Sequence, residues 1–218
     1  EISNSIDGVV TELITGDVMP QTLVELLDED GNKLQEIASD DNGYFIFDEL
    51  QPDTKYTTKV IKQGYFEAVE EVTTIENDTV SVALKLKKLK EMITMENGVK
   101  KLKTEMIFFD FDKSYIRKDA SIELDKLVEV MNEYPNMVIK IESHTDARGN
   151  DDYNENLSDR RAKSTRDYIV SQGIASNRIE SATGYGEKLL INECSNGVEC
   201  SNARHDLNRR SEFIIIKM

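Results

Sequence analysis

The hydrophobic pattern of this chain changes its period once, near residue 90. Before that point, short runs alternate apolar and polar residues, and turn sequences such as DEDGNK and QPDTKY separate them. A period of two is typical of half-buried strands, and the clearest run has apolar side chains at Val80, Val82, Leu84 and Leu86. DEDGN lacks the ligand series and terminal Glu of a helical calcium loop, so we interpret it as a hairpin turn. Residues 1–90 are therefore predicted to form an all-β sandwich without a helix.

Beyond residue 104, strand patterns alternate with helical ones. TEMIFFDFD, NMVIKIESHT and SEFIIIKM have the composition of strands, and two helices are predicted at 118–134 and 151–172, ended by Pro135 and Gly173. The first helix has one apolar stripe, formed by Ala120, Leu124, Leu127, Val128, Met131 and Tyr134. This order predicts an α/β sandwich of the βαβαβ type at residues 104–218, with both helices on one face of a small mixed sheet. Residues 91–103, where alternation fades and Lys accumulates, are predicted to be a linker that carries a short strand or a turn at ENG.

The composition excludes some classes of partner. The 218 residues have a formal net charge of -15 and a pI of about 4.6, which disfavours binding to nucleic acid or to an anionic lipid surface. No apolar run is long enough to span a membrane. The sequence starts at Glu1 without a leader, so we expect it to be a processed chain or a piece of a longer one.

The two cysteines, Cys194 and Cys200, lie six residues apart in the polar stretch NECSNGVECSN. A disulfide between them would close a small loop, and the chain-entropy model predicts that it stabilises the folded state by roughly 2 kcal/mol. Free thiols are the second interpretation. Zinc is the third, because the nearest further ligand is the single residue His205. A disulfide would indicate an oxidising compartment such as the periplasm.

Polar residues gather where the predicted strands of the second half end. They are Asp110, Asp112, His144, Thr145 and Asp146, and Arg160 and Arg161 lie on the helix that follows the last of them. His144 has no Ser or Cys nucleophile in an elbow sequence, no second His at metal-ligand spacing and no Gly-rich phosphate loop, so no catalytic residue and no metal or other cofactor is predicted. A carboxylate and a guanidinium facing one groove can instead bind the ammonium and carboxylate of a zwitterion.

The first half resembles the carboxypeptidase regulatory-like domain family. The similarity rests on the opening GVV, a Pro before the second strand, the DGN hairpin, DDNGYFIFDEL and the following PDTKY. It implies a transthyretin-like β-sandwich that acts as a spacer or interaction module and has no catalytic activity.

Residues 104–218 resemble the OmpA-like C-terminal domain family, on the segments MIFFDFDKSYIRKDA, HTDARGNDDYNENLSDRRAKS, RIESATGYGEKLLIN and NRRSEFIII. The resemblance implies noncovalent binding of the meso-diaminopimelate of peptidoglycan stem peptides. Asp146 would pair with the amine of the ligand and Arg161 with its carboxylate. Thr145, Asp110 and Phe109 would form the wall of the pocket, and Arg209 is a further candidate.

The Cys-bearing insertion before NRR resembles a subgroup from Bacteroidetes outer-membrane-associated proteins. The domain pair resembles the peptidoglycan-tethering subunit associated with type IX secretion. These resemblances imply a non-enzymatic periplasmic anchor, associated with the outer membrane, whose first domain contacts protein partners. The alternatives are a scaffold that binds only proteins and, less favoured, an accessory subunit of a wall-processing enzyme, which would have a metal or nucleophile near His144.

Overall fold

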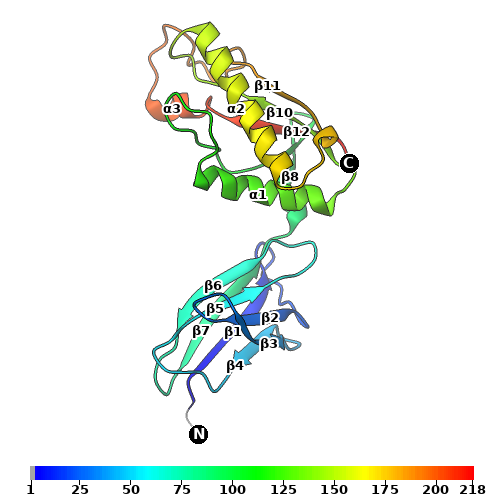
Figure 1. Ribbon diagram of the computed structural model, residues 1–218, viewed down its shortest axis with the longest axis vertical. Coiled ribbons are helices and arrows are strands. Elements are labelled where there is room, and N and C mark those ends of the chain that lie inside the picture. Colours follow the sequence, from blue (N-terminus) through cyan, green and yellow to red (C-terminus); the bar gives the residue numbers. More distant parts are fainter. Residues whose placement is uncertain (1–2) are drawn as a thin grey trace. The chain divides into compact units, whose positions relative to one another are not determined.

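The computed structural model describes residues 3–218 and divides into two compact units, Glu1–Leu89 and Lys90–Met218 (Figure 1). Unit 1 contains two sheets. The first has the order β4-β1-β7 and consists of β1 (Ser5–Glu12), β4 (Tyr44–Phe47) and β7 (Thr79–Leu86). The second has the order β3-β2-β5-β6 and consists of β2 (Leu23–Leu27), β3 (Lys33–Ala38), β5 (Lys55–Val60) and β6 (Ala68–Thr73). The predicted all-β architecture of the first half is confirmed.

The core of unit 1 follows from the period-two alternation of its strands. Alternate apolar side chains of β1, β2, β4, β5 and β7 pack into one buried cluster, which includes Ile6, Val10, Val24, Leu26, Phe45, Phe47, Val60, Leu84 and Leu86. DEDGN is the turn between β2 and β3. Asp28 accepts hydrogen bonds from the backbone N–H groups of Asp30 and Asn32, and Gly31 has a φ of 83°, a conformation that favours glycine.

Unit 2 contains one five-stranded sheet with the order β11-β10-β12-β9-β8. Its elements are η1 (Leu89–Met92), β8 (Ile93–Glu96), β9 (Val99–Leu102), α1 (Lys118–Glu133), β10 (Val138–Ser143), α2 (Asp151–Ser171), η2 (Ser176–Arg178), β11 (Ile179–Gly184), α3 (Asn202–Asp206) and β12 (Ser211–Lys217). β10 is parallel to β11, whereas β12 is antiparallel to β10 and to β9. None of the helices described within residues 3–218 is long and apolar enough for a membrane span.

The linker predicted at residues 91–103 is wrong, because this segment is part of unit 2, whereas the strand and turn expected at ENG are confirmed. The segment forms the β8–β9 hairpin, which adds to the free edge of β12. The backbone hydrogen bonds between the hairpin and β12 join residues that are far apart in the sequence. The weak local alternation of the segment therefore could not predict that it belongs to the sheet.

The predicted strand TEMIFFDFD is also wrong, because residues 104–112 have an irregular conformation. Leu102 of β9 lies opposite Phe213, and β12 begins only two residues before Phe213, at Ser211. The chain that follows β9 therefore runs past the start of β12, where no strand is present to accept its backbone hydrogen bonds. Its apolar side chains instead line a pocket, which is described below.

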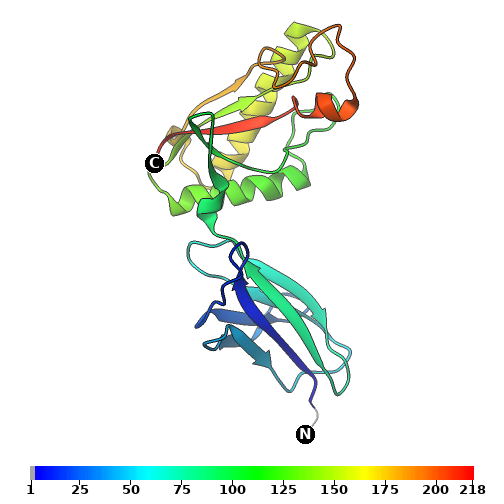
Figure 2. The ribbon, with the colours of Figure 1, turned by 180° about the vertical axis from the view of Figure 1, so that it is seen from behind.

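Figures 1 and 2 view unit 2 from opposite sides and show α2 on one face of the sheet, with α1 beside it. The predicted stripe of α1 is buried, except that Tyr134 lies just beyond the helix and is half-buried. Asn150 caps α2 by accepting a hydrogen bond from the backbone N–H of Tyr153. Gly173, with a φ of 100°, follows the end of α2 as predicted.

Candidate functional site

A pocket of about 600 Å³ lies in unit 2 where β10 ends and β12 begins. This volume is in the range of small-molecule and peptide sites. The lining residues come from the irregular segment before α1, the end of β10, the first turns of α2 and the start of β12: Met106, Ile107, Phe108, Phe109, Phe111, Asp112, Ser143, His144, Thr145, Asp146, Arg148, Tyr153, Asn154, Leu157, Arg161, Arg209, Arg210 and Ser211. Four of them are arginines and two are aspartates, so the pocket is locally cationic in a chain whose net charge is -15.

Asp146 lies three residues beyond β10 and is buried. Its Oδ2 is 2.7 Å from Nη2 of Arg148 and 3.1 Å from Nη1 of Arg209, and its Oδ1 accepts a hydrogen bond from the backbone N–H of Arg148. Burial by itself would raise the pKa of Asp146, but the hydrogen bonds from Arg148 and the charges of both arginines outweigh it, and the pKa falls below its ordinary value. Asp146 is therefore a fixed anion at physiological pH.

Arg161 extends from α2 toward the irregular segment. Its Nε and Nη2 donate hydrogen bonds to the backbone carbonyls of Lys113 and Asp110, and its guanidinium carbon lies 4.8 Å from the centroid of the Phe109 ring. Burial lowers the pKa of this guanidinium. Within residues 3–218 no carboxylate forms an ion pair with Arg161, whereas Arg148, Arg209 and Arg210 each have at least one. Arg161 is thus the pocket arginine that has no carboxylate at ion-pair distance in the part of the chain that the structure describes, and the charge of Asp112 offsets its burial only in part.

The structure brings five of the six predicted ligand-binding side chains to this pocket. Asp146, Arg161, Thr145, Phe109 and Arg209 line it. The buried hydroxyl of Thr145 has no hydrogen-bond partner within residues 3–218. Asp110 is the exception: its carboxylate accepts from Arg117 and from the Tyr115 hydroxyl, and only its backbone carbonyl contacts a pocket residue, Arg161.

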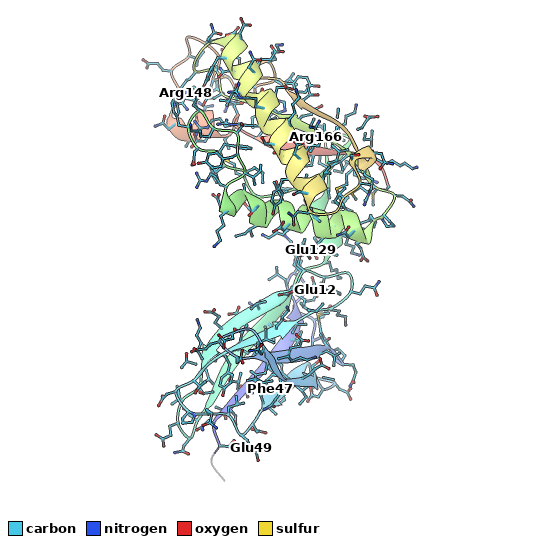
Figure 3. All side chains as sticks on the ribbon, in the orientation of Figure 1. Glu12, Phe47, Glu49, Glu129, Arg148 and Arg166 are labelled. Atoms are coloured by element: carbon cyan, nitrogen blue, oxygen red, sulfur yellow. A yellow bond between two sulfur atoms is a disulfide. The ribbon has the colours of Figure 1, made fainter. Side chains whose placement is uncertain are left out.

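Several lining residues lie outside the predicted set. Arg148 is two residues after Asp146, so the TDARG motif contained the signal, and Figure 3 shows it near α3. Tyr153 donates a hydrogen bond from its hydroxyl to Asp112. Phe108 and Phe111 are 49% and 95% exposed, so the rim of the pocket presents aromatic surface to solvent. No local pattern had distinguished these two rings from core residues of a strand.

Cys194 and Cys200 form a disulfide, which confirms the first of the three interpretations. The loop that they close leads into α3, which Ser201 caps. The side-chain oxygen of Asn202 in α3 accepts a hydrogen bond of 2.9 Å from Arg148. The insertion therefore holds one of the two arginines that pair with Asp146.

His144 is buried at the floor of the pocket, and its ring stacks on that of Tyr185 with centroids 5.6 Å apart. Burial, with a smaller contribution from the charge of Arg210, lowers the pKa of His144 to about 4. The imidazole is therefore neutral at physiological pH. No Ser or Cys side chain forms a hydrogen bond with it in the described part of the chain.

Each unit matches one protein family. Residues 108–204 match the OmpA family, and residues 5–87 match the carboxypeptidase regulatory-like domain. A peptidoglycan-associated lipoprotein of Rhizobium meliloti is 42% identical over 111 residues, which are 51% of this chain and 60% of the lipoprotein. The chain thus spans about three fifths of the length of that relative.

Two solved structures have lower similarity. A putative MotB like protein from Desulfovibrio vulgaris has a TM-score of 0.48 and 23% identity, over 58% of this chain and 78% of its own. The peptidoglycan-associated lipoprotein from Burkholderia pseudomallei has a TM-score of 0.45 and 24% identity, over 52% of this chain and 90% of its own. Similarity at this level carries no functional argument.

Proposed function

Because the chain contains an OmpA family domain preceded by a carboxypeptidase regulatory-like domain, we propose that it binds peptidoglycan noncovalently and anchors its partners to the cell wall. The name of the Rhizobium meliloti relative, which covers half of this chain, supports the proposal. The pocket of unit 2 is the binding site in this proposal. Its role in this proposal is recognition, since its residues are suited to holding charged groups.

The observation that carries the proposal is the charge of Arg161. A half-buried guanidinium without a carboxylate partner is unfavourable, and a ligand carboxylate would supply the missing counter-ion through two parallel hydrogen bonds. Asp146 offers the complementary group, because a ligand ammonium can donate to its carboxylate beside Arg148 and Arg209. Diaminopimelate has both groups free on one side chain, and it is the ligand that we propose for this pair.

We place the protein in the periplasm, in association with the outer membrane. The Cys194–Cys200 disulfide supports this location, since disulfides persist in oxidising compartments. Unit 1 serves as a spacer or as a docking module for envelope proteins. Many copies along the wall would add avidity to a modest single-site affinity.

Sedimentation with purified diaminopimelate-type peptidoglycan tests the binding. Wild-type protein should pellet with the wall material, and Asp146→Asn or Arg161→Gln should weaken binding about tenfold or more, because a charge-assisted hydrogen bond contributes roughly 1.5–3 kcal/mol. Asp152→Asn and Arg160→Gln are matched controls, since both residues are exposed on α2 and should leave binding unchanged. Wild-type protein that stays in the supernatant would refute the proposal.

A second preparation of peptidoglycan tests whether diaminopimelate is the recognised group, independently of whether the protein binds peptidoglycan at all. If lysine replaces diaminopimelate in the stem peptide, the ligand keeps its amine but loses the carboxylate that Arg161 would bind. Binding should then weaken to the level of Arg161→Gln. Equal binding to both preparations would leave the anchor intact and eliminate diaminopimelate as the recognised group.

A further inference from the structure

Two carboxylates face each other on the neighbouring strands β10 and β12. They lie on the face of the sheet opposite to the one that buries Ile139 and Ile141. Glu142 and Glu212 are directly paired in the register of this antiparallel ladder. Like charges in directly opposed positions destabilise a sheet. Glu142 has no hydrogen bond or ion pair within residues 3–218, and burial together with the charge of Glu212 raises its pKa despite the nearby cations. Glu212 has cationic partners in Lys101 and Arg210, whereas Glu142 has no direct partner in the described part of the chain.

His144 adds a second anomaly at the same place. Its side chain is only 1% exposed, and both ring nitrogens are buried without a hydrogen-bond partner among the described residues. A buried polar group without a partner is costly, and native proteins rarely contain one without a reason. Nε2 of His144 lies 3.9 Å from Oε2 of Glu212, so the imidazole is aimed at the opposed carboxylates.

We propose that Glu142, His144 and Glu212 bind a divalent cation, and that the cation is zinc. One ligand atom from each residue lies within 4.8 Å of the other two. Zinc accepts imidazole nitrogen and carboxylate oxygen at about 2.0–2.2 Å, which places neighbouring ligand atoms of a tetrahedral site roughly 3.3–3.5 Å apart. The distance between His144 and Glu212 is 3.9 Å and needs to shorten by about 0.5 Å. The distances that involve Glu142 are up to 4.8 Å and need to shorten by up to about 1.5 Å, which rotations of the two Glu side chains can supply.

A zinc ion would resolve both anomalies together. Its two positive charges would neutralise the opposed carboxylates, and its bond to the imidazole would satisfy one orphaned nitrogen. Three protein ligands would leave the fourth position for a water molecule. The site goes beyond peptidoglycan binding, although His144 also lines the pocket.

Nearby cations limit the affinity of this site. Lys101 and Arg210 lie 3.3 and 3.1 Å from Oε1 of Glu212, whereas the oxygen that faces His144 is Oε2. One oxygen of Glu212 therefore holds the protein cations and the other is available to the metal. Lys140 also lowers the negative potential at Glu142, but its own ion pair is with Glu180, at 3.3 Å. Loss of the Lys101 charge should consequently strengthen zinc binding.

Equilibrium dialysis of the full chain tests the proposal. Protein stripped with a chelator is dialysed against zinc in the presence of excess magnesium, which suppresses weak binding to the acidic surface. We expect one zinc per chain. Glu142→Gln, Glu212→Gln and His144→Gln should each weaken zinc binding tenfold or more. Glu133→Gln is the control, because Glu133 is exposed at the end of α1, and it should leave zinc binding unchanged.

Two further measurements guard against a variant that fails to fold. Lys101→Met keeps every ligand and should bind zinc several-fold more tightly. Cobalt(II) in place of zinc should give the visible absorption of a tetrahedral nitrogen–oxygen site, and Glu142→Gln should abolish it. The proposal would be overturned if wild-type protein bound no more zinc than Glu142→Gln. It would also be overturned if none of the three ligand substitutions changed the affinity for zinc.

Discussion

Replacing Gly184 with alanine should push α2 away from β11. A Cβ atom at this position would lie 2.0 Å from the backbone nitrogen of Asp159 and 2.3 Å from the carbonyl carbon of Ser158, whereas ordinary contacts begin at 3.4 Å. The helix must therefore retreat by about 1.4 Å, because backbone atoms have no rotamer by which to avoid the clash. Overpacking of this kind costs about 1–3 kcal/mol, and we expect the upper end of that range.

Circular dichroism at 222 nm measures this effect, because the described helices α1, α2 and α3 all belong to unit 2. A loss of about 3 kcal/mol should lower the unfolding midpoint by roughly 6–12 °C. Gly173→Ala is the control: its φ is 100° and no atom lies within 4 Å of the new methyl, so only backbone strain of about 1 kcal/mol is added. If Gly184→Ala melts within about 2 °C of wild type, or no lower than Gly173→Ala, the close approach of α2 to β11 is not as described.

Acidification in the presence of a chelator should destabilise unit 2. The pKa of His144 is about 4 in the folded protein against an ordinary 6.5, so the unfolded chain binds its proton first and stability falls between pH 6.5 and pH 4 by at most about 3 kcal/mol. Urea titrations at 222 nm should show this loss, and an equal loss in His144→Gln would exclude His144 as its source. Reducing the Cys194–Cys200 disulfide should cost about 2 kcal/mol from the entropy of the opened loop, and an unchanged melting curve with reductant would contradict this. Leu124→Ala, at a fully buried position of α1, should cost about 2–5 kcal/mol, whereas Ile122→Ala, on the exposed face of the same helix, should cost about 0.5 kcal/mol or less. Similar losses in these two variants would show that α1 packs differently.

The local sequence determined the elements that have a strong period and clear ends. The apolar stripe of α1, the left-handed Gly173 after α2 and the DEDGN hairpin were all predictable, because each depends on neighbours within a few residues. The TDARG and DRRA motifs also brought Asp146 and Arg161 to one pocket, as expected of a strand end and the helix that follows it. The disulfide was predictable too, because a spacing of six residues in a polar stretch lets the two cysteines meet.

Tertiary structure alone decided which distant groups meet. The β8–β9 hairpin belongs to the sheet because β12 has a free edge, and TEMIFFDFD is irregular because β12 starts too late to pair with it. Arg209 pairs with Asp146 across 63 residues, and Glu212 faces Glu142 through the register of β10 and β12. A shift of one residue in that register would send these side chains to the opposite face, and no local pattern specifies which residue of one strand lies opposite which residue of another. The sequence by itself therefore determined the elements and the binding motif, whereas long-range pairing decided the charges around that motif and the carboxylates beside His144.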